Sequence, residues 1–586
     1  GSLFVGSNGS LNQLVITNGG VVAVTDYARL GFTSGSFGNL VSVYGPGSQW
    51  QVGSNLSVGY DGSGNRLRII NGASVSNVIG FIGLNGVSSN NVVEVNGSNS
   101  TWTSGGDLNV GFDGSGNTLL ITNGGRVANS VNAEIGCRGT GNRVIVTGSN
   151  SAWNDSGGLT LGFMGLSNTL LISNGGTVTS TGGIIGYGPF GSGGNGNAVI
   201  VTGSKSVWSN SGSLNIGFSG GMFNSLDIVN GGSVFAAGVL VGGSGYPGNR
   251  LTVNGGTLSV TNAAGNAGLV IGVSTNDLNG GLIEADALRM QTSSGRLQFN
   301  GGILNVRTSA VANGTNFMVG DGISAATYRM TGASSNVHSF ANGLVISSNA
   351  TLAGKGTIIG SVTNFGTITP GLSAGAINLN NNLSLRSNAN LSFEIGGLIA
   401  TNEYDVLNVT SFVNLAGTLS LSLINNFYPA SAAAFRVSNF ASATGAFGNV
   451  TSGARLNTTD NLGSFLVTLS VTNLVVGNYV SPDSDGDGMT DYAEFLAGTD
   501  PADPASVLKI VLLAFNGAGQ PVVRFPFVAG KNYRILYTDD LSSGVWSAVN
   551  SPTFTTPLAG FYEWTDDGTQ TGGLNSAARF YRIGLQ

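Results

Sequence analysis

This sequence carries very little charge. Asp, Glu, Lys and Arg make up 9% of its 586 residues and leave a formal net charge of −6, whereas a typical soluble domain has roughly 25% charged residues. No basic stripe is present to neutralise phosphates, so nucleic acid is excluded as a partner. The 41% of hydrophobic residues argues against disorder. The surface must therefore consist largely of Ser, Thr, Asn and Gly, which favours an extracellular or cell-surface location.

Other residue types are scarce as well. A single cysteine, Cys137, excludes an internal disulfide. No apolar run reaches the roughly 18 residues of a transmembrane helix, so we expect no transmembrane segment. The first residues, Gly1 to Gly6, already fit the repeat described below, and we expect no signal peptide in this chain. The only histidine, His338, has no nearby Ser and Asp that would suggest a catalytic triad, so we expect a structural role.

The clearest feature that is present is an asparagine that returns about every 26 residues through the first half of the chain. Each is followed by alternating apolar residues, as in Asn65-x-Leu67-x-Ile69, which is typical of β-strands. We therefore predict an all-β fold dominated by a right-handed parallel β-helix, with one coil per repeat. Inside it, the amide of each asparagine should bond to the next in a continuous ladder. The ladder residues are Asn12, Asn39, Asn65, Asn91, Asn117, Asn142, Asn168, Asn197, Asn224, Asn249 and Asn276.

A second marker, an aliphatic residue followed by Gly, also occurs once per coil, as at Val58-Gly59. Because side chains on a strand alternate between its faces, Val58 and Tyr60 should both point inward, as should Asn71. The position of Tyr60 holds an aromatic residue in most coils and Cys137 in one. We expect these side chains in the core, with Cys137 as a small buried hydrophobe. Only an outward orientation would make the aromatic residues a platform for glycans.

Coils also alternate in pairs. One type ends in Asn-Gly-Gly, as at Asn123-Gly124-Gly125, and the other in Gly-x-x-Ser-x-Trp, as at Gly97 to Trp102. These units resemble the repeats of autotransporter-type and exosortase-sorted bacterial surface proteins, and later phrases such as Asn364-Phe365-Gly366-Thr367-Ile368 resemble autotransporter passenger regions. The resemblance covers residues 1–475 and implies an exported β-helix. Neither a translocator barrel nor a hydrophobic sorting tail follows, so we expect either a different export route or processed ends that this sequence does not include.

The strongest local motif is Asp-x-Asp-x-Asp-Gly-x-x-Asp-x-x-Glu at residues 483–494, which matches the calcium loop of an EF-hand. Oxygen ligands at this spacing favour calcium over zinc, and a merely acidic linker is the alternative. We expect a helix over residues 491–497 that stops at Gly498. The motif resembles dockerin and thrombospondin type 3 calcium repeats. The expected ligands are Asp483, Asp485, Asp487, the carbonyl of Met489, Asp491 and Glu494.

The chain therefore divides into four predicted parts. Regular β-helix repeats occupy residues 1–345 and a less regular C-terminal β-helix segment residues 346–480. The calcium loop forms a linker over residues 481–504, and residues 505–586 form a small β-sandwich. In the sandwich we expect strands at residues 508–515, 522–527, 533–537 and 580–583.

Our hypothesis for function is a non-enzymatic extracellular structural protein. Its N-terminal coil, which has no cap, would dock head to tail on another copy and build a filament or matrix. One alternative is a monomeric adhesin that binds cell-surface or matrix glycans. A second is a polysaccharide-degrading enzyme using Asp61 and Asp113, which lie two coils, or roughly 9.6 Å, apart. Asp-Gly is common turn chemistry, so we expect these two aspartates to be structural.

Overall fold

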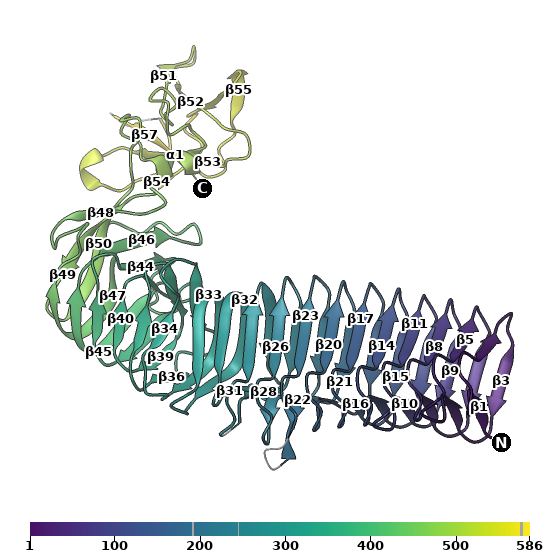
Figure 1. Ribbon diagram of the computed structural model, residues 1–586. Coiled ribbons are helices and arrows are strands. Elements are labelled where there is room, and N and C mark those ends of the chain that lie inside the picture. The colour runs from purple at the N-terminus through teal and green to yellow at the C-terminus, as the bar shows by residue number, and fades with distance from the viewer. Residues whose placement is uncertain (190–192, 244, 575–577, 586) are drawn as a thin grey trace.

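The computed structural model describes residues 1–189, 193–243, 245–574 and 578–585. Its main part is a long parallel β-helix (Figure 1), as the sequence predicts. Each regular coil has three short strands, for example β7 (Leu56–Val58), β8 (Arg66–Ile70) and β9 (Ser74–Asn77). Each strand pairs in parallel with its counterpart one coil further on, here β10 (Gly80–Ile82), β11 (Val92–Asn96) and β12 (Thr101–Ser104). Among the described residues, no helix is long and apolar enough to cross a membrane.

The first strand of every regular coil contributes to one continuous parallel sheet, called the first face below. Within each strand the side chains alternate, and the end residues of β4, for example, are buried while Arg29 between them points outward. The strands are β1 (Leu3–Val5), β4 (Ala28–Leu30), β7, β10, β13 (Leu108–Val110), β16 (Ala133–Ile135), β19 (Gly158–Leu161), β22 (Gly182–Tyr187), β25 (Ser213–Phe218), β28 (Gly238–Val241) and β31 (Gly268–Ile271).

The asparagine ladder runs along a corner between the first and second strands. The backbone N–H and side-chain Nδ2 of each asparagine both donate to Oδ1 of the asparagine one coil further on, as between Asn65 and Asn91 at 2.9 and 3.1 Å. Asn91 continues in the same way to Asn117. The chain of side-chain bonds extends from Asn12 to Asn249, and all members except the exposed Asn12 are buried.

The predicted ladder is wrong at its last member. Ser274 occupies the register position opposite Asn249, and Asn276 lies two residues further along, where its Oδ1 accepts from the backbone of Leu251. The Nδ2 of Asn249 turns instead to the carbonyl groups of Gly221 and Tyr246. The spacing from Asn249 to Asn276 preserves the repeat length but not the register.

The glycine of the second marker adopts a left-handed backbone in each coil from Gly6 to Gly242, though not at Gly272, and this overturns two expectations about orientation. Gly59 has φ +80°, a conformation that breaks the alternation of side chains assumed from strand geometry. The following aromatic residue is therefore directed outward, and Tyr60 is only half-buried. Asn71, which was expected inside, is likewise exposed and left-handed. Cys137 occupies the same outward position as Tyr60 and is nevertheless buried, as expected.

The tryptophans of alternate coils lie inside the tube. Trp50, Trp102, Trp153 and Trp208 are all fully buried on the third strand of their coils. The indole N–H of Trp102 donates to Oδ1 of Asn77 at 2.7 Å, whereas that of Trp50 has no partner. One hydrophobic core extends from Val5 to Tyr479, so the coils on both sides of residue 345 share it.

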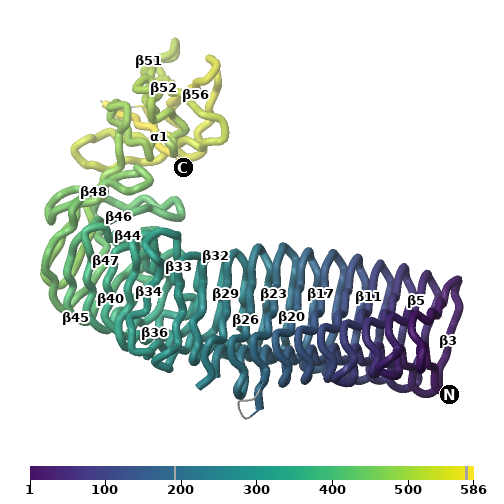
Figure 2. Tube along the Cα trace, viewed as in Figure 1, coloured from purple at the N-terminus to yellow at the C-terminus, as the bar shows by residue number. Residues whose placement is uncertain are grey.

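The coils change character at two long strands, β32 (Thr275–Met290) and β33 (Arg296–Val311). Each follows several sides of the tube, and beyond them the stack of coils bends (Figure 2). Parallel pairing continues to β45 (Val406–Leu415) and β47 (Ala434–Gly445). Antiparallel strands β48 (Arg455–Asn457), β49 (Ser464–Leu469) and β50 (Asn473–Val480) then end the solenoid, a feature that the sequence did not predict.

The C-terminal domain is a small sandwich of two antiparallel sheets, as predicted. Its sheets are β51-β52-β56-β55 and β54-β53-β57, and they enclose a separate core around Phe525 and Trp564. Three of the strands, β54, β55 and β56, were not predicted. The bounds are β51 (Leu512–Phe515), β52 (Pro521–Pro526), β53 (Tyr533–Thr538), β54 (Ser547–Ala548), β55 (Thr555–Leu558), β56 (Phe561–Thr565) and β57 (Phe580–Leu585).

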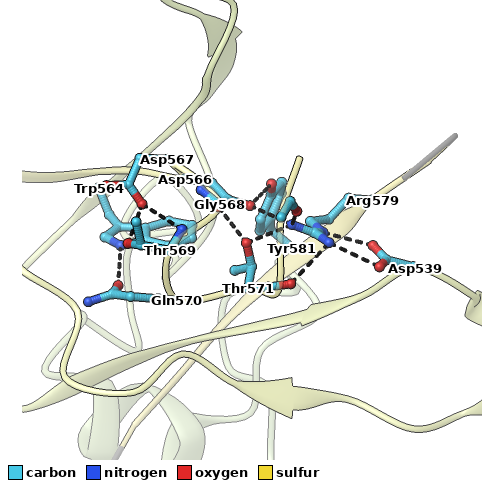
Figure 3. A network of polar contacts seen from close by, with 11 residues as sticks. Asp539, Trp564, Asp566, Asp567, Gly568, Thr569, Gln570, Thr571, Arg579 and Tyr581 are labelled. Carbon is cyan, nitrogen blue, oxygen red and sulfur yellow. Dashed lines mark hydrogen bonds and ion pairs between the residues drawn. The ribbon is translucent and has the colours of Figure 1, made fainter. Parts of the chain in front are cut away.

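A polar network fastens the end of this domain. Arg579 lies between Asp539, with which it pairs at 2.7 and 3.0 Å, and the buried Asp566 at 3.1 Å (Figure 3). Asp566 also accepts from Thr571 and Tyr581. Although burial opposes its charge, these hydrogen bonds keep the pKa of Asp566 below its usual value. The network ties β57 to the loops that follow β53 and β56.

Candidate metal centre

The acidic loop connects β50 to the helix α1 (Asp491–Ala497), whose bounds match the prediction. Thr490 caps the N-terminus of this helix and Gly498, with φ +80°, ends it. Gly486 and Gly488 also have positive φ, +76° and +91°, which lets the loop turn sharply. As a result the carboxylates of alternate residues are directed toward one another.

Three of the predicted ligands form a cluster. Asp483, Asp485 and Asp487 each offer a carboxylate oxygen within 4.8 Å of the others. Loop amides fix their orientation: Asp483 accepts from the N–H groups of Gly486 and Gly488 at 2.9 and 3.0 Å, and Asp487 accepts from Met489 at 2.7 Å. The second oxygens of Asp485 and Asp487 are buried and accept no hydrogen bond. A cation is the partner that such oxygens lack.

Glu494 is brought to this cluster by the first turn of α1. Its side chain is fully buried, and neither carboxylate oxygen has a hydrogen-bond partner among the residues that the structure describes. Burial, together with the nearby charges of Asp485 and Asp487, raises the pKa of Glu494 above its usual value. An unpaired buried carboxylate is costly, and a bound dication would offset both the burial and the repulsion. The donor set consists of oxygens, which suits calcium.

Of the other two predicted ligands, Asp491 has a partner within the loop, and the carbonyl of Met489 stays a prediction. The carboxylate of Asp491 accepts from both the backbone N–H and the hydroxyl of Ser484 at 2.7 Å, so it fastens the start of the loop. Met489 donates its N–H to Asp487. The structure thus gathers Asp483, Asp485 and Asp487, and it places Glu494 close enough for the charges of Asp485 and Asp487 to act on it. Asp491 holds a supporting position.

The helix that carries Glu494 also touches both neighbouring domains. On one side, Tyr492 stacks on Tyr428 of the solenoid with ring centroids 3.4 Å apart. On the other, the hydroxyl of Tyr533 donates to the carbonyl of Ala497 at 3.1 Å and Lys531 donates to the carbonyl of Phe495 at 3.0 Å. Sequence reasoning missed these contacts, because nothing near Tyr428 or Tyr533 marks them as partners of a helix far away in the chain.

The remaining candidate residues have structural partners. Asp113 forms an ion pair with Arg138, and Asp61 accepts from Asn85 at 2.9 Å. His338 is buried with its Nδ1 2.9 Å from the hydroxyl of Tyr328, and burial lowers its pKa to about 4. Burial and the adjacent Glu134 raise the pKa of Cys137 to about 12, so its thiol is not activated as a nucleophile.

Comparison with known proteins agrees with this geometry. A search of curated proteins finds no match for the chain. Within the chain, the family model of the bacterial TSP3 repeat, a calcium-binding type, matches residues 483–504, the segment that holds the acidic cluster, Glu494 and α1.

Proposed function

We propose that this chain is an extracellular structural protein: a stiff β-solenoid whose C-terminal sandwich is held in place by a calcium-dependent joint. The β-solenoid and the calcium-binding repeat are consistent with such a role. The observation that carries the proposal is the position of α1. One helix buries the unpartnered carboxylate of Glu494 at the acidic cluster and contacts both the solenoid and the sandwich.

Calcium would act through the order of the loop. Binding draws Glu494 and the three aspartates onto one ion, which fixes α1 relative to the loop. The Tyr492–Tyr428 and Tyr533–Ala497 contacts then position the sandwich on the end of the solenoid. Without the ion, the carboxylates repel one another and the joint loosens.

Small-angle scattering with calcium and with chelator tests this idea on the whole chain. We expect calcium to narrow the distribution of molecular dimensions and chelator to broaden it. Glu494→Gln should weaken calcium binding by about tenfold or more, whereas Glu284→Gln, which removes one exposed carboxylate from β32, should leave it unchanged. Equal dimensions in both conditions, or an unchanged affinity in the Glu494 variant, would refute the joint.

Head-to-tail assembly into a filament, and attachment to the cell surface, are further parts of this proposal. Electron microscopy of concentrated protein in calcium tests assembly, and dispersed single rods would argue for the monomeric adhesin instead.

We also propose that the chain is not an enzyme. In support, Asp61 and Asp113, the pair considered for polysaccharide cleavage, are engaged with Asn85 and Arg138.

A further inference from the structure

The first face of the solenoid carries a row of aromatic side chains at its edge. They follow the left-handed glycine of their coils and lie on the surface, half-buried or, for Phe218, 38% exposed. We call this row the aromatic stripe. Its members are Phe32, Tyr60, Phe112, Phe163, Tyr187 and Phe218.

The stripe is ordered by contacts between neighbouring coils. Phe163, Tyr187 and Phe218 form its longest group, with ring centroids 4.8 and 5.5 Å apart and ring planes at 59° and 30° to each other. Phe32 and Tyr60 form a second group at 5.3 Å. Because adjacent strands are about 4.8 Å apart, the seven coil steps from Phe32 to Phe218 span roughly 34 Å. Leu84 and Cys137 hold the same position in two of the coils, so only Phe163, Tyr187 and Phe218 form a run of three adjacent coils.

The surroundings of the stripe are polar but nearly neutral. Thr160 and Asn215 lie at outward positions of β19 and β25, next to the longest ring group. The guanidinium group of Arg29 lies 4.0 Å from the Tyr60 ring centroid, and Arg138, 4.9 Å from the Phe112 centroid, is paired with Asp113. The two guanidinium groups cover the rings of Tyr60 and Phe112, so the uncovered part of the stripe is the group from Phe163 to Phe218, which has hydrogen-bonding neighbours and no strong field of either sign.

We propose that the aromatic stripe binds a linear, uncharged, β-linked polysaccharide in an extended conformation along the solenoid axis. The apolar C–H faces of the sugars would pack on the rings, while their hydroxyl groups would bond to Thr160 and Asn215. The coil spacing is close to the length that one β-1,4-linked hexose adds to an extended chain, so successive sugars can meet the rings of Phe163, Tyr187 and Phe218 in three adjacent coils. The inference adds a ligand to the proposed extracellular rod and rests on its location outside the cell.

Calorimetric titration of the full-length protein in calcium tests the proposal. The probes are the β-1,4-linked hexasaccharides of glucose, mannose and xylose, with the α-1,4-linked glucose hexasaccharide, which coils, as the comparison. We expect at least one β-linked probe to bind and the α-linked one to bind more weakly. Since an aromatic contact contributes about a 2- to 12-fold change in affinity, the triple variant Phe163→Ala, Tyr187→Ala, Phe218→Ala should weaken binding by roughly tenfold or more.

A control uses aromatic residues that are more exposed than those of the stripe and lie off it. Phe223 and Phe235 are 64% and 42% exposed, and their replacement by alanine should leave the affinity unchanged. If the triple variant does not fold, Phe218→Ala alone replaces it. In addition, hydroxyl-radical footprinting of the unmodified protein should show protection of Tyr60 and Tyr187 by the bound probe.

Several results would overturn the inference. These are no binding of any β-linked probe, equal weakening in the control variant, or no protection of the two tyrosines. Binding only to anionic polysaccharides, with strong dependence on salt, would also contradict it. The calcium-dependent change in scattering is measured separately. A calcium-dependent change in dimensions without any oligosaccharide binding would refute this inference and leave the proposed function unaffected.

Discussion

Removing one amide from the middle of the ladder gives the sharpest test of what stabilises the solenoid. Asn117 is fully buried, and its Oδ1 accepts from both the backbone N–H and the Nδ2 of Asn91 at 2.9 and 3.0 Å. Its own Nδ2 donates to Asn142 at 3.1 Å. In Asn117→Ala, the backbone N–H of Asn91 loses its acceptor in a buried place, and Nδ2 of Asn91 keeps only its bond to Oγ of Ser88 at 3.0 Å.

The size of the effect follows from those two donors. Leaving a buried donor without a partner costs about 1–3 kcal/mol, and losing one of two hydrogen bonds costs about 0.5–1.5 kcal/mol. The free energy of unfolding should therefore fall by roughly 1.5–4.5 kcal/mol. The comparison is Asn12→Ala. Asn12 is exposed and donates to Asn39 but accepts no ladder bond within the described chain, so its loss should cost about 1 kcal/mol or less.

Denaturant unfolding followed by tryptophan fluorescence measures both variants, since the buried Trp102 and Trp153 lie in the coils on either side of Asn117. Solenoids unfold in segments, so the transition of these two tryptophans is the relevant one. If Asn117→Ala and Asn12→Ala shift that transition equally, the ladder does not carry the stability assigned to it.

Three further changes have definite expected outcomes. Trp50→Phe should lower the free energy of unfolding by about 1–2 kcal/mol less than Trp102→Phe does, because only Trp102 loses an indole hydrogen bond. Thermal or denaturant unfolding measures both variants, and equal losses would contradict the expectation. Lowering the pH from 6.5 to 4 should reduce the free energy of unfolding by about 3 kcal/mol through His338. Its folded pKa of about 4 lies below the unfolded value of 6.5, so the unfolded chain takes up the proton first. In His338→Gln, denaturant midpoints should lose this part of their pH dependence. Gly59→Ala should lower the free energy of unfolding by at least about 1–2 kcal/mol, since φ is +80° and the new methyl group would overlap the Asn91 amide. An unchanged melting temperature would refute this expectation.

The coil architecture could be predicted because one residue type reports on it in every repeat. A buried amide has to find a partner, and a partner at a fixed spacing along the chain makes the period visible in the sequence. The ladder from Asn12 to Asn249 follows directly from this requirement. Register is not visible in the same way, since Asn276 keeps the spacing while Ser274 takes the paired position.

The orientation of the aromatic stripe could not be predicted from strand alternation. The rule places Tyr60 inside only if the backbone is extended throughout, and Gly59 is left-handed instead. The cue was available, because a glycine repeated at one position of every coil indicates a conformation that other residues avoid. Read in that way, the same pattern would have placed the rings on the surface.

The candidate metal centre was predicted in part. Ligand spacing indicated Asp483, Asp485, Asp487 and Glu494, because the loop is local in sequence and its geometry follows from the turn residues. The role of Asp491 as a partner of Ser484 depends on how the loop closes. The contact of α1 with Tyr428 depends on how two domains meet, and a local pattern contains no information about that.

Each ladder amide and the glycine of a neighbouring coil share one space. A Cβ at Gly31 would overlap the Asn65 amide, and one at Gly83 would overlap that of Asn117. Neither position can take a larger side chain unless its partner changes as well. Such a tube should tolerate duplication or deletion of whole windings far better than changes within one, so its length is the property that gene-level recombination, or an engineer, can alter most freely.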